Sequence, residues 1–343
     1  MTRAAADTPL AISMGDAAGI GPEIVVKAFL RGHAEACVVY GCPQVLARAA
    51  RLLARADGCA PCVVAHIDTP AAWRTVPAGA IPVVRARGID SELLAGIRYG
   101  LVDARAGAAA HASIVDAAQA ALRGEVSGLV TAPIHKEALH AAGVDFPGHT
   151  ELLQHLCGGA PVRMMLANEQ LRTVLVTIHL SVRRALDAIT EEAVLQTLRI
   201  THAASRAWGR QAARIAVAGL NPHAGEGGLF GDEEMRLIQP AIARARAEGI
   251  LASGPYAPDT VFMRARNAEG HPGEFDVVVA MLHDHALIPV KYLGLDQGVN
   301  VTLGLPFVRT SPDHGTAFDI AGRGVADDAS LCSAIAMARR LGA

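Results

Sequence analysis

The sequence is poor in aromatic residues, carries little net charge and lacks long apolar runs. Phe, Trp and Tyr make up 4% of its 343 residues, which leaves few rings for stacking on nucleic acid bases. A formal net charge of −2 provides no attraction to nucleic acid or to an anionic membrane surface. No uncharged apolar run approaches the roughly 18 residues of a membrane span, and segment 1–7 has no signal-peptide core. We therefore expect a cytoplasmic protein that binds neither nucleic acid nor membrane.

The six cysteines form no disulfide framework and no complete zinc pattern. Cys59 and Cys62 have the spacing of a redox or zinc motif, but the chain offers no second pair. They follow Asp57-Gly58 in a predicted loop, not at the start of a helix. Buried, reduced thiols are the favoured interpretation, and a functional role for this pair is the alternative.

Short apolar runs alternate with amphipathic stretches along the whole chain. The pattern predicts strands over residues 10–13, 37–40, 62–65, 81–84 and 128–131, and helices from Pro22 and over residues 43–56, 106–123, 191–208, 233–248 and 328–341. Such alternation is typical of a largely parallel sheet covered by helices on both faces. We predict an α/β protein of two lobes with a central cleft, with residues 1–140 and 310–343 in the first lobe and 141–309 in the second.

Three further apolar runs lead to a histidine, at His179, His223 and His283. Each run is expected to be a buried strand, and ligands bind beyond the carboxyl ends of strands in open α/β sheets. Neutral imidazole is a common metal ligand, and three histidines with open coordination positions are typical of a catalytic divalent-metal site. An ordinary hydrogen-bonded histidine at each strand end is the alternative.

Three other segments have the chemistry of ligand-binding loops. Residues 15–23 match neither the dinucleotide fingerprint nor a P-loop, but they form a glycine-rich turn onto a helix that can meet an anion or be purely structural. Residues 221–228 are too rich in glycine for regular structure and present His223. His149 and Thr150 open a helix, where they either cap it or bind phosphate.

The segment from His283 to Gly322 reads HDHALIPVKYLGLDQGVNVTLGLPFVRTSPDHGTAFDIAG. Together with SMGDAAGIGPE, TAPIHKEALHAAG, GHTELL and GLNPHAGEGGLFGDEE, it resembles the 4-hydroxythreonine-4-phosphate dehydrogenase family over nearly the whole chain. The run HGTAFDIAG is also similar to the cofactor loop of isocitrate and isopropylmalate dehydrogenases. The resemblance implies their two-lobed fold, without a Rossmann fingerprint.

The resemblance also implies roles for particular residues. It implies that His179, His223 and His283 hold a divalent metal (zinc, magnesium, manganese or cobalt) at a homodimer interface, where one ligand comes from the partner; we take this ligand to be His283. It implies that substrate is bound by His149, Thr150, Lys291, Asn300 and Arg309, that Asp259 and Lys291 are catalytic, and that NAD or NADP is bound by His314, Gly315, Thr316 and Asp319. Without the resemblance, Lys291 and Arg309 would be interpreted as solvated surface charges.

The implied reaction is NAD(P)- and metal-dependent oxidation of the C3 hydroxyl of 4-hydroxy-L-threonine 4-phosphate, followed by decarboxylation, in pyridoxal phosphate biosynthesis. The main alternative is a dehydrogenase of D-threonate or D-erythronate 4-phosphate in sugar-acid catabolism; an aromatic cis-dihydrodiol dehydrogenase and a non-enzymatic metabolite sensor are weaker ones. The pair His149-Thr150 favours a phosphorylated substrate. Two positions depart from the family pattern, His285 in place of glutamine and Ala17 in place of proline, and His285 either adjusts metal or substrate preference or is neutral.

Overall fold

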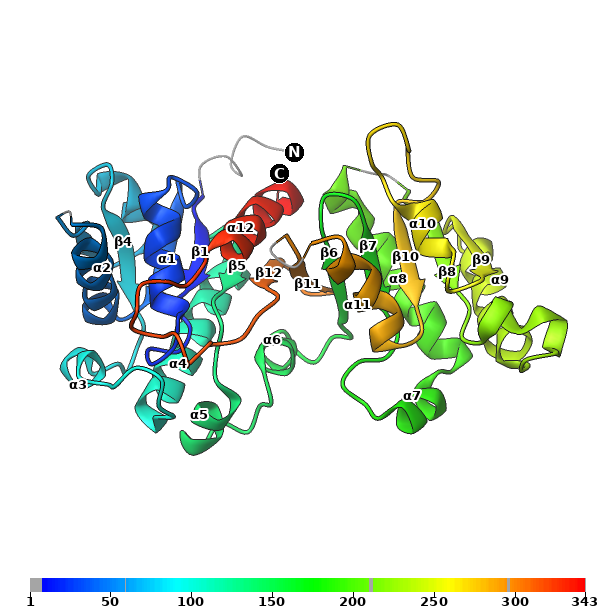
Figure 1. Cartoon of the computed structure of the whole chain (residues 1–343), viewed down its shortest axis with the longest axis horizontal. Coiled ribbons are helices and arrows are strands. Elements are labelled where there is room, and N and C mark those ends of the chain that lie inside the picture. The colour runs from blue at the N-terminus through cyan, green and yellow to red at the C-terminus, as the bar shows by residue number, and fades with distance from the viewer. Residues whose placement is uncertain (1–7, 59, 210–211, 295–296, 343) are drawn as a thin grey trace. The chain divides into compact units, whose positions relative to one another are not determined.

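The computed structural model describes residues 8–58, 60–209, 212–294 and 297–342, so Cys59 lies outside the described residues (Figure 1). The chain divides into two compact units, the first made of Met1–Ala160 and Leu305–Ala343 and the second of Pro161–Gly304. The first unit is larger than the sequence predicts. Its core explains the difference, because Leu152 and Leu153 pack in one cluster with Leu129, and Leu305 and Phe307 pack against that cluster.

The first unit contains a fully parallel set of strands. They are β1 (Leu10–Ser13), β2 (Cys37–Gly41), β3 (Val64–Ile67), β4 (Ile81–Arg85), β5 (Gly128–Thr131) and β12 (Val308–Pro312), in the order β3-β4-β2-β1-β5-β12. Its helices are α1 (Gly21–Leu30), α2 (Pro43–Asp57), η1 (Pro70–Thr75), α3 (Ser91–Ala95), α4 (Ala104–Leu122), α5 (Lys136–Ala141), α6 (His149–Leu156) and α12 (Ala329–Gly342). Helix α12 returns to this unit as predicted, and the Thr310 hydroxyl donates to the Ala334 carbonyl at 2.8 Å.

The second unit has a mixed set of strands. They are β6 (Arg163–Ala167), β7 (Arg172–Leu175), β8 (Ile215–Ala218), β9 (Ala252–Tyr256), β10 (Val277–Ala280) and β11 (Val299–Leu303), in the order β11-β6-β7-β10-β8-β9. The four strands from β7 to β9 are parallel, whereas β6 runs antiparallel to β7 and β11. Its helices are α7 (Val182–Ala188), α8 (Glu191–Ser205), η2 (Arg206–Trp208), η3 (Pro222–Gly228), η4 (Glu234–Ile238), α9 (Gln239–Ala247), α10 (Val261–Ala265) and α11 (His283–Tyr292).

The prediction of a mostly parallel α/β protein is confirmed, because the fully apolar runs are central strands. All four residues of β8 and all four of β10 are buried, as expected for strands covered on both faces. The antiparallel strands β6 and β11 were not predicted, and β3 begins at Val64 instead of Cys62. Among the described residues, no helix is both long and apolar enough to cross a membrane.

Close contact between α4 and α5 depends on a glycine. A Cβ atom at Gly107 would lie 2.0 Å from the carbonyl oxygen and 2.3 Å from the carbonyl carbon of Ala138. Backbone atoms cannot move aside as a flexible side chain does, so the two helices would have to separate.

We expect Gly107→Ala to lower the free energy of unfolding by about 1–3 kcal/mol, because the overpacking cost exceeds the ~1 kcal/mol gain in helix propensity. Gly96→Ala is the matched control, since its added Cβ meets no atom closer than 3.6 Å. Urea unfolding of both variants tests this prediction. An unchanged midpoint for Gly107→Ala would show that the contact is not a tight one.

Candidate active site

The predicted site residues are divided between the two units. His149, Thr150, Arg309 and the loop 314–319 belong to the first unit, although the sequence places the substrate contacts in the second. The three histidines, Asp259, Lys291 and Asn300 belong to the second unit.

In the first unit, Arg309 places a positive charge in the protein interior. Arg309 lies in β12 and is 3% exposed, contrary to the surface position that its residue type suggests. Its Nη2 atom donates to the Thr131 hydroxyl at the end of β5, at 2.7 Å. Burial lowers the pKa of Arg309 to about 10, and the nearby Glu151 carboxylate opposes this shift. The guanidinium is still charged at neutral pH, so the site favours an anion.

His149 stands beside this charge at the first position of α6, after an extended Gly148. Its ring hydrogen-bonds to the backbone of Ala132, and its buried Nε2 atom has no hydrogen-bond partner among the described residues. Burial and the Arg309 charge lower the pKa of His149 well below its ordinary value. A bound anion would offset the Arg309 charge, and Thr150 with the first backbone N–H groups of α6 would supply further donors.

The predicted cofactor loop is fixed against the glycine-rich turn 15–23. The Ile20 N–H donates to the Thr316 carbonyl at 3.0 Å, and a Cβ at Gly19 would lie 2.9 Å from the Cβ of Thr316. The Glu23 carboxylate accepts from the N–H groups of Gly322 and Gly324, at 2.5 and 3.0 Å. Two motifs from opposite ends of the sequence therefore form one substructure, on which His314, Gly315 and Asp319 are exposed.

Sequence reasoning missed two polar residues beside this substructure, the half-buried His135 and the buried Asp16. The His135 ring stacks on Phe318 with 4.4 Å between ring centres, and its Nδ1 atom is buried without a partner among the described residues. Asp16 is fully buried; burial raises its pKa, while a hydrogen bond from the Ala18 N–H and the proximity of His135 oppose the shift. Both residues follow strand ends, and that position was the signal that could have identified them.

In the second unit, two of the three predicted metal ligands lie together. The ring centres of His179 and His283 are 5.8 Å apart. At metal–nitrogen distances of about 2.0–2.1 Å, two imidazoles on one ion have ring centres about 5–6 Å apart. Asp284 Oδ1 lies 2.8 Å from His283 Nδ1, which leaves the opposite nitrogen, Nε2, to face a metal. This pair therefore fits a divalent ion.

These two histidines line a cavity of about 410 Å³ that is formed entirely within the second unit. His285 lines it as well; its Nδ1 atom is buried without a partner among the described residues, and burial lowers its pKa. The lining contains neither His223 nor Asp259 nor Lys291 among the described residues. Among the described residues of the single chain, no three His, Cys, Asp or Glu side chains are placed to hold one metal ion.

His223 does not line the cavity of this pair, and it lies on a turn with an unusual backbone. It opens a run of five left-handed residues, His223 to Gly227, and His179 is also left-handed with φ of 50°. A left-handed residue with a side chain costs roughly 1–2 kcal/mol, and His223, Ala224 and Glu226 all carry this cost. Strain of this kind is concentrated at functional sites, where the surrounding structure must compensate for it.

The other predicted residues of the second unit lie on separate elements. Asp259 is exposed in the turn between β9 and α10, Lys291 is in the last turn of α11, and Asn300 is in β11. The structure therefore brings together the His179–His283 pair in the second unit and the His149–Arg309 pair in the first.

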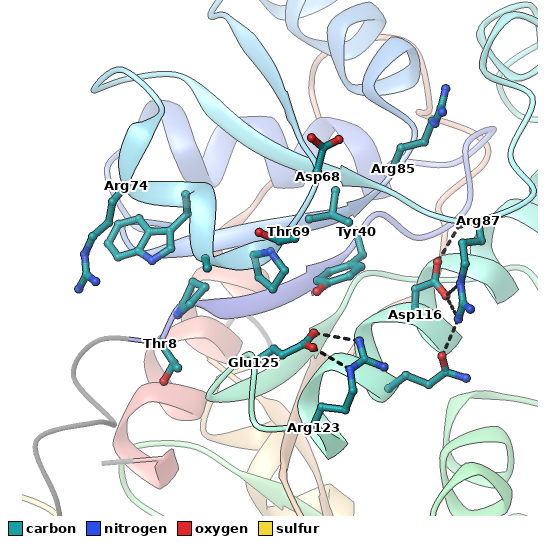
Figure 2. Close-up of a pocket in the computed structure, with 16 residues that line it drawn as sticks. Thr8, Tyr40, Asp68, Thr69, Arg74, Arg85, Arg87, Asp116, Arg123 and Glu125 are labelled. Carbon is teal, nitrogen blue, oxygen red and sulfur yellow. Dashed lines mark hydrogen bonds and ion pairs between the residues drawn. The ribbon is translucent and has the colours of Figure 1, made fainter.

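A larger cavity of about 740 Å³ in the first unit contains none of the predicted residues. Figure 2 shows two ion pairs along its wall, Arg87 with Asp116 and Arg123 with Glu125, near the ring of Tyr40. Each pair brings opposite charges together on this wall, and Asp68, Arg74 and Arg85 also line the cavity.

Comparison with known proteins gives one consistent family. The family model described as pyridoxal phosphate biosynthetic protein PdxA matches residues 33–338. A 4-hydroxythreonine-4-phosphate dehydrogenase of Beijerinckia indica is 53% identical over 98% of this chain and 95% of its own length. A D-threonate 4-phosphate dehydrogenase of Salmonella typhimurium is 45% identical over 97% of this chain and 98% of its own. A crystal structure of 4-hydroxythreonine-4-phosphate dehydrogenase from Klebsiella pneumoniae superimposes with a TM-score of 0.87 at 42% identity, covering 98% and 100% of the two chains.

The lowered pKa of His149 predicts a specific pH dependence of stability. Below its ordinary pKa of about 6.5 the unfolded chain binds a proton that the folded chain does not, so stability falls by up to about 1.4 kcal/mol per pH unit. His149→Gln removes this titration, and its unfolding free energy should decrease less than that of the wild type between pH 7.5 and pH 5. His66→Gln, at an exposed position, is the control. Equal pH dependence of the wild type and His149→Gln, measured by urea unfolding, would contradict the assignment.

Proposed function

Because the chain belongs to the pyridoxal phosphate biosynthetic protein PdxA family, a family of dehydrogenases, we propose that it oxidises 4-hydroxy-L-threonine 4-phosphate with NAD or NADP and a divalent metal. The observation that carries the proposal is the buried guanidinium of Arg309 in β12 beside the half-buried His149 at the start of α6. A charged guanidinium, an imidazole and a helix N-terminus together suit a phosphorylated acid.

In this proposal, each group of residues binds one part of the reactants. His149 and Thr150 hold the phosphate, while Arg309, Asn300 and Lys291 orient the rest of the acid. His314, Gly315, Thr316 and Asp319 would hold the nicotinamide cofactor, which would supply the hydride-accepting chemistry. His179, His223 and His283 would hold the metal, which as a Lewis acid would stabilise negative charge on the substrate oxygens.

The remaining chemistry is proton transfer by the chain's own residues. As hydride leaves C3, Asp259 accepts the proton of the C3 hydroxyl, and the product is a β-keto acid. Loss of carbon dioxide then breaks the C1–C2 bond and leaves its electron pair on C2. The Lys291 ammonium group donates the proton that completes C2. Two electrons pass to the cofactor, and one carbon leaves as carbon dioxide.

We propose that the metal site is completed by a second subunit, as the sequence resemblance implies, but with a different division of ligands. His179 and His283 already lie together in one chain, and His223 stands apart on its strained turn. We therefore assign His223, in place of His283, to the site of the partner. The protein is then a homodimer with two equivalent sites, the commonest symmetry of homo-oligomers.

The substrate proposal is tested by measuring formation of NADH and NADPH with three phosphorylated acids: 4-hydroxy-L-threonine 4-phosphate, D-threonate 4-phosphate and D-erythronate 4-phosphate. We expect the highest kcat/KM with the amino acid, in keeping with the 53% identical relative. A higher value with either sugar acid would instead favour the activity named for the 45% identical relative. Absence of turnover with all three would reject a phosphorylated substrate.

Mixing of inactive variants tests the division of metal ligands. His179→Ala, His223→Ala and His283→Ala should each lose metal binding and activity, because each removes one ligand. Mixing His179→Ala with His223→Ala should restore about a quarter of the sites, since half of the dimers are mixed and each mixed dimer has one intact site. His283→Ala mixed with His223→Ala should behave in the same way.

The third pair is the control. Mixing His179→Ala with His283→Ala should restore nothing, because both sites of the mixed dimer then carry one lesion. Native mass spectrometry of tagged chains establishes that subunits exchange. Recovery in this third mixture would instead mean that His179 and His283 serve different sites, and no recovery in any exchanging mixture would place all three ligands in one subunit.

A further inference from the structure

The turn that carries His223 has no core of its own. Of its residues, Gly225 is buried, whereas His223, Glu226, Gly227 and Gly228 are exposed. Apolar packing on this turn is limited to a few contacts, such as that of the His223 ring with Phe230, whose ring centres are 6.0 Å apart. Something outside the turn must fix it, or the position of the imidazole would be poorly defined.

Glu234, the first residue of η4, makes the contacts that hold the base of this turn. Its Oε1 atom accepts from the backbone N–H groups of both Leu220 and Asn221, each at 2.7 Å. Its Oε2 atom accepts from the Asn221 side-chain amide at 2.9 Å. A single carboxylate thus binds three donors on the two residues that lead into the turn, and these donors orient both of its oxygens.

The same carboxylate also touches the middle of the turn. A Cβ at Gly225 would lie 2.8 Å from Oε2 of Glu234, so the backbone there approaches the carboxylate as closely as glycine permits. A Cβ at Gly219 would lie 3.1 Å from Oε1. Glu234 therefore contacts the chain before the turn and within it.

Glu234 is suited to this role because it is buried and charged. It is 1% exposed. Burial by itself raises the pKa of Glu234, but the hydrogen bonds from Asn221 and Leu220 outweigh burial and lower it. An ionised carboxylate is a stronger acceptor than a neutral amide, and it cannot be removed without leaving buried backbone N–H groups unsatisfied.

We propose that Glu234 is the positioning residue for His223, fixing the left-handed turn so that the imidazole is held ready for a metal. The inference rests on the proposed metal-binding role of His223. Residues that orient metal ligands typically change metal affinity by about 10–100-fold when they are altered.

The first test compares Co²⁺ binding by the full-length wild type, Glu234→Gln and Glu234→Ala, using competition with a chromophoric chelator and the visible spectrum of bound Co²⁺. Glu234→Gln keeps an oxygen for the two backbone donors and should lose about 10-fold in affinity, whereas Glu234→Ala should lose about 100-fold. The Co²⁺ spectrum should lose the contribution of one imidazole. Wild-type affinity and spectrum in a folded Glu234→Ala protein would overturn the proposal.

Asp276 provides a matched control, because it lies at the amino-terminal ends of strands β8 and β10, opposite the ends that lead to His223 and His283. Asp276 is buried just before β10, and its carboxylate accepts from the Arg214 N–H just before β8, at 2.8 Å. Asp276→Asn and Asp276→Ala make the same chemical changes at another carboxylate that accepts from a backbone N–H. This carboxylate is not part of the turn that carries His223. They should leave Co²⁺ affinity unchanged even if they lower stability, which separates positioning from general destabilisation.

Relief of strain provides a rescue experiment. Glycine tolerates the left-handed region that Ala224 and Glu226 are forced to adopt, with φ of 53° and 42°. Adding Ala224→Gly and Glu226→Gly to Glu234→Ala should recover part of the lost Co²⁺ affinity, because the turn then needs less external support. No recovery in a folded triple variant would argue against strain as the reason that Glu234 is needed.

Hydrogen exchange separates failure of this inference from failure of the proposed function. In metal-free protein, the amides of residues 219–231 should exchange about 10-fold faster in Glu234→Gln than in the wild type. Unchanged exchange would overturn the inference whether or not metal binds, and it decides the case if Glu234→Ala does not fold. If the wild type binds no Co²⁺, or if Co²⁺ binding survives His223→Ala, the proposed metal site is rejected instead.

Discussion

Parallel strand pairing is the constraint on which the candidate site depends. Within each unit, parallel strands bring their carboxyl ends to one edge, so the loops that follow them gather there. In the first unit this edge collects Asp16 after β1 and His135 after β5, with Thr131 at the end of β5 itself. In the second unit it collects His179 after β7 and His283 after β10. The candidate site thus combines residues that are far apart in the sequence, some in the loops that follow strands and others, such as Thr131 and Arg309, within the strands themselves.

The site residues work against the stability of the units that hold them. Arg309 is charged and buried, and burial together with the Arg309 charge lowers the pKa of His149 well below its ordinary value. His179 and His223 occupy backbone conformations that their side chains disfavour. In the proposed function, an anion bound beside Arg309 would offset the buried charge. The strained backbone at His179 and His223 would place two ligands of the metal, in keeping with the concentration of such strain at functional sites.

The elements that could be predicted from the sequence are those whose residue pattern lies within one short stretch of the chain. The apolar runs at residues 10–13, 128–131 and 277–280 are strands because their residues are buried on both faces, and periodicity reveals this directly. The three histidines were found because each follows such a run. These predictions required only the neighbours in the chain.

The features that could not be predicted from the sequence depend on residues that lie far apart in the chain. Arginine is a residue type that is usually exposed, whereas Arg309 is buried, and its hydrogen-bond partner Thr131 lies far back along the chain. Residue type did not predict the left-handed backbone of His179 and His223, because glycine is the usual marker of that region. The assignment of substrate contacts to the second unit also failed for His149 and Arg309, since the core that holds α6 is formed by β5, α4 and the chain around Phe307.

The proposed division of metal ligands has a thermodynamic consequence for assembly. Two imidazoles from one chain bind a divalent ion less tightly than three, so the contribution of His223 from a partner raises metal affinity only in the dimer. By linkage, the metal must stabilise the dimer by the same free energy. A rigid His223 turn increases this coupling, because an imidazole already in place loses little conformational entropy when it binds. The strain in residues 223–227, the carboxylate of Glu234 that offsets it and the separation of His223 from the His179–His283 pair are then parts of one arrangement, in which the subunits and the metal depend on each other.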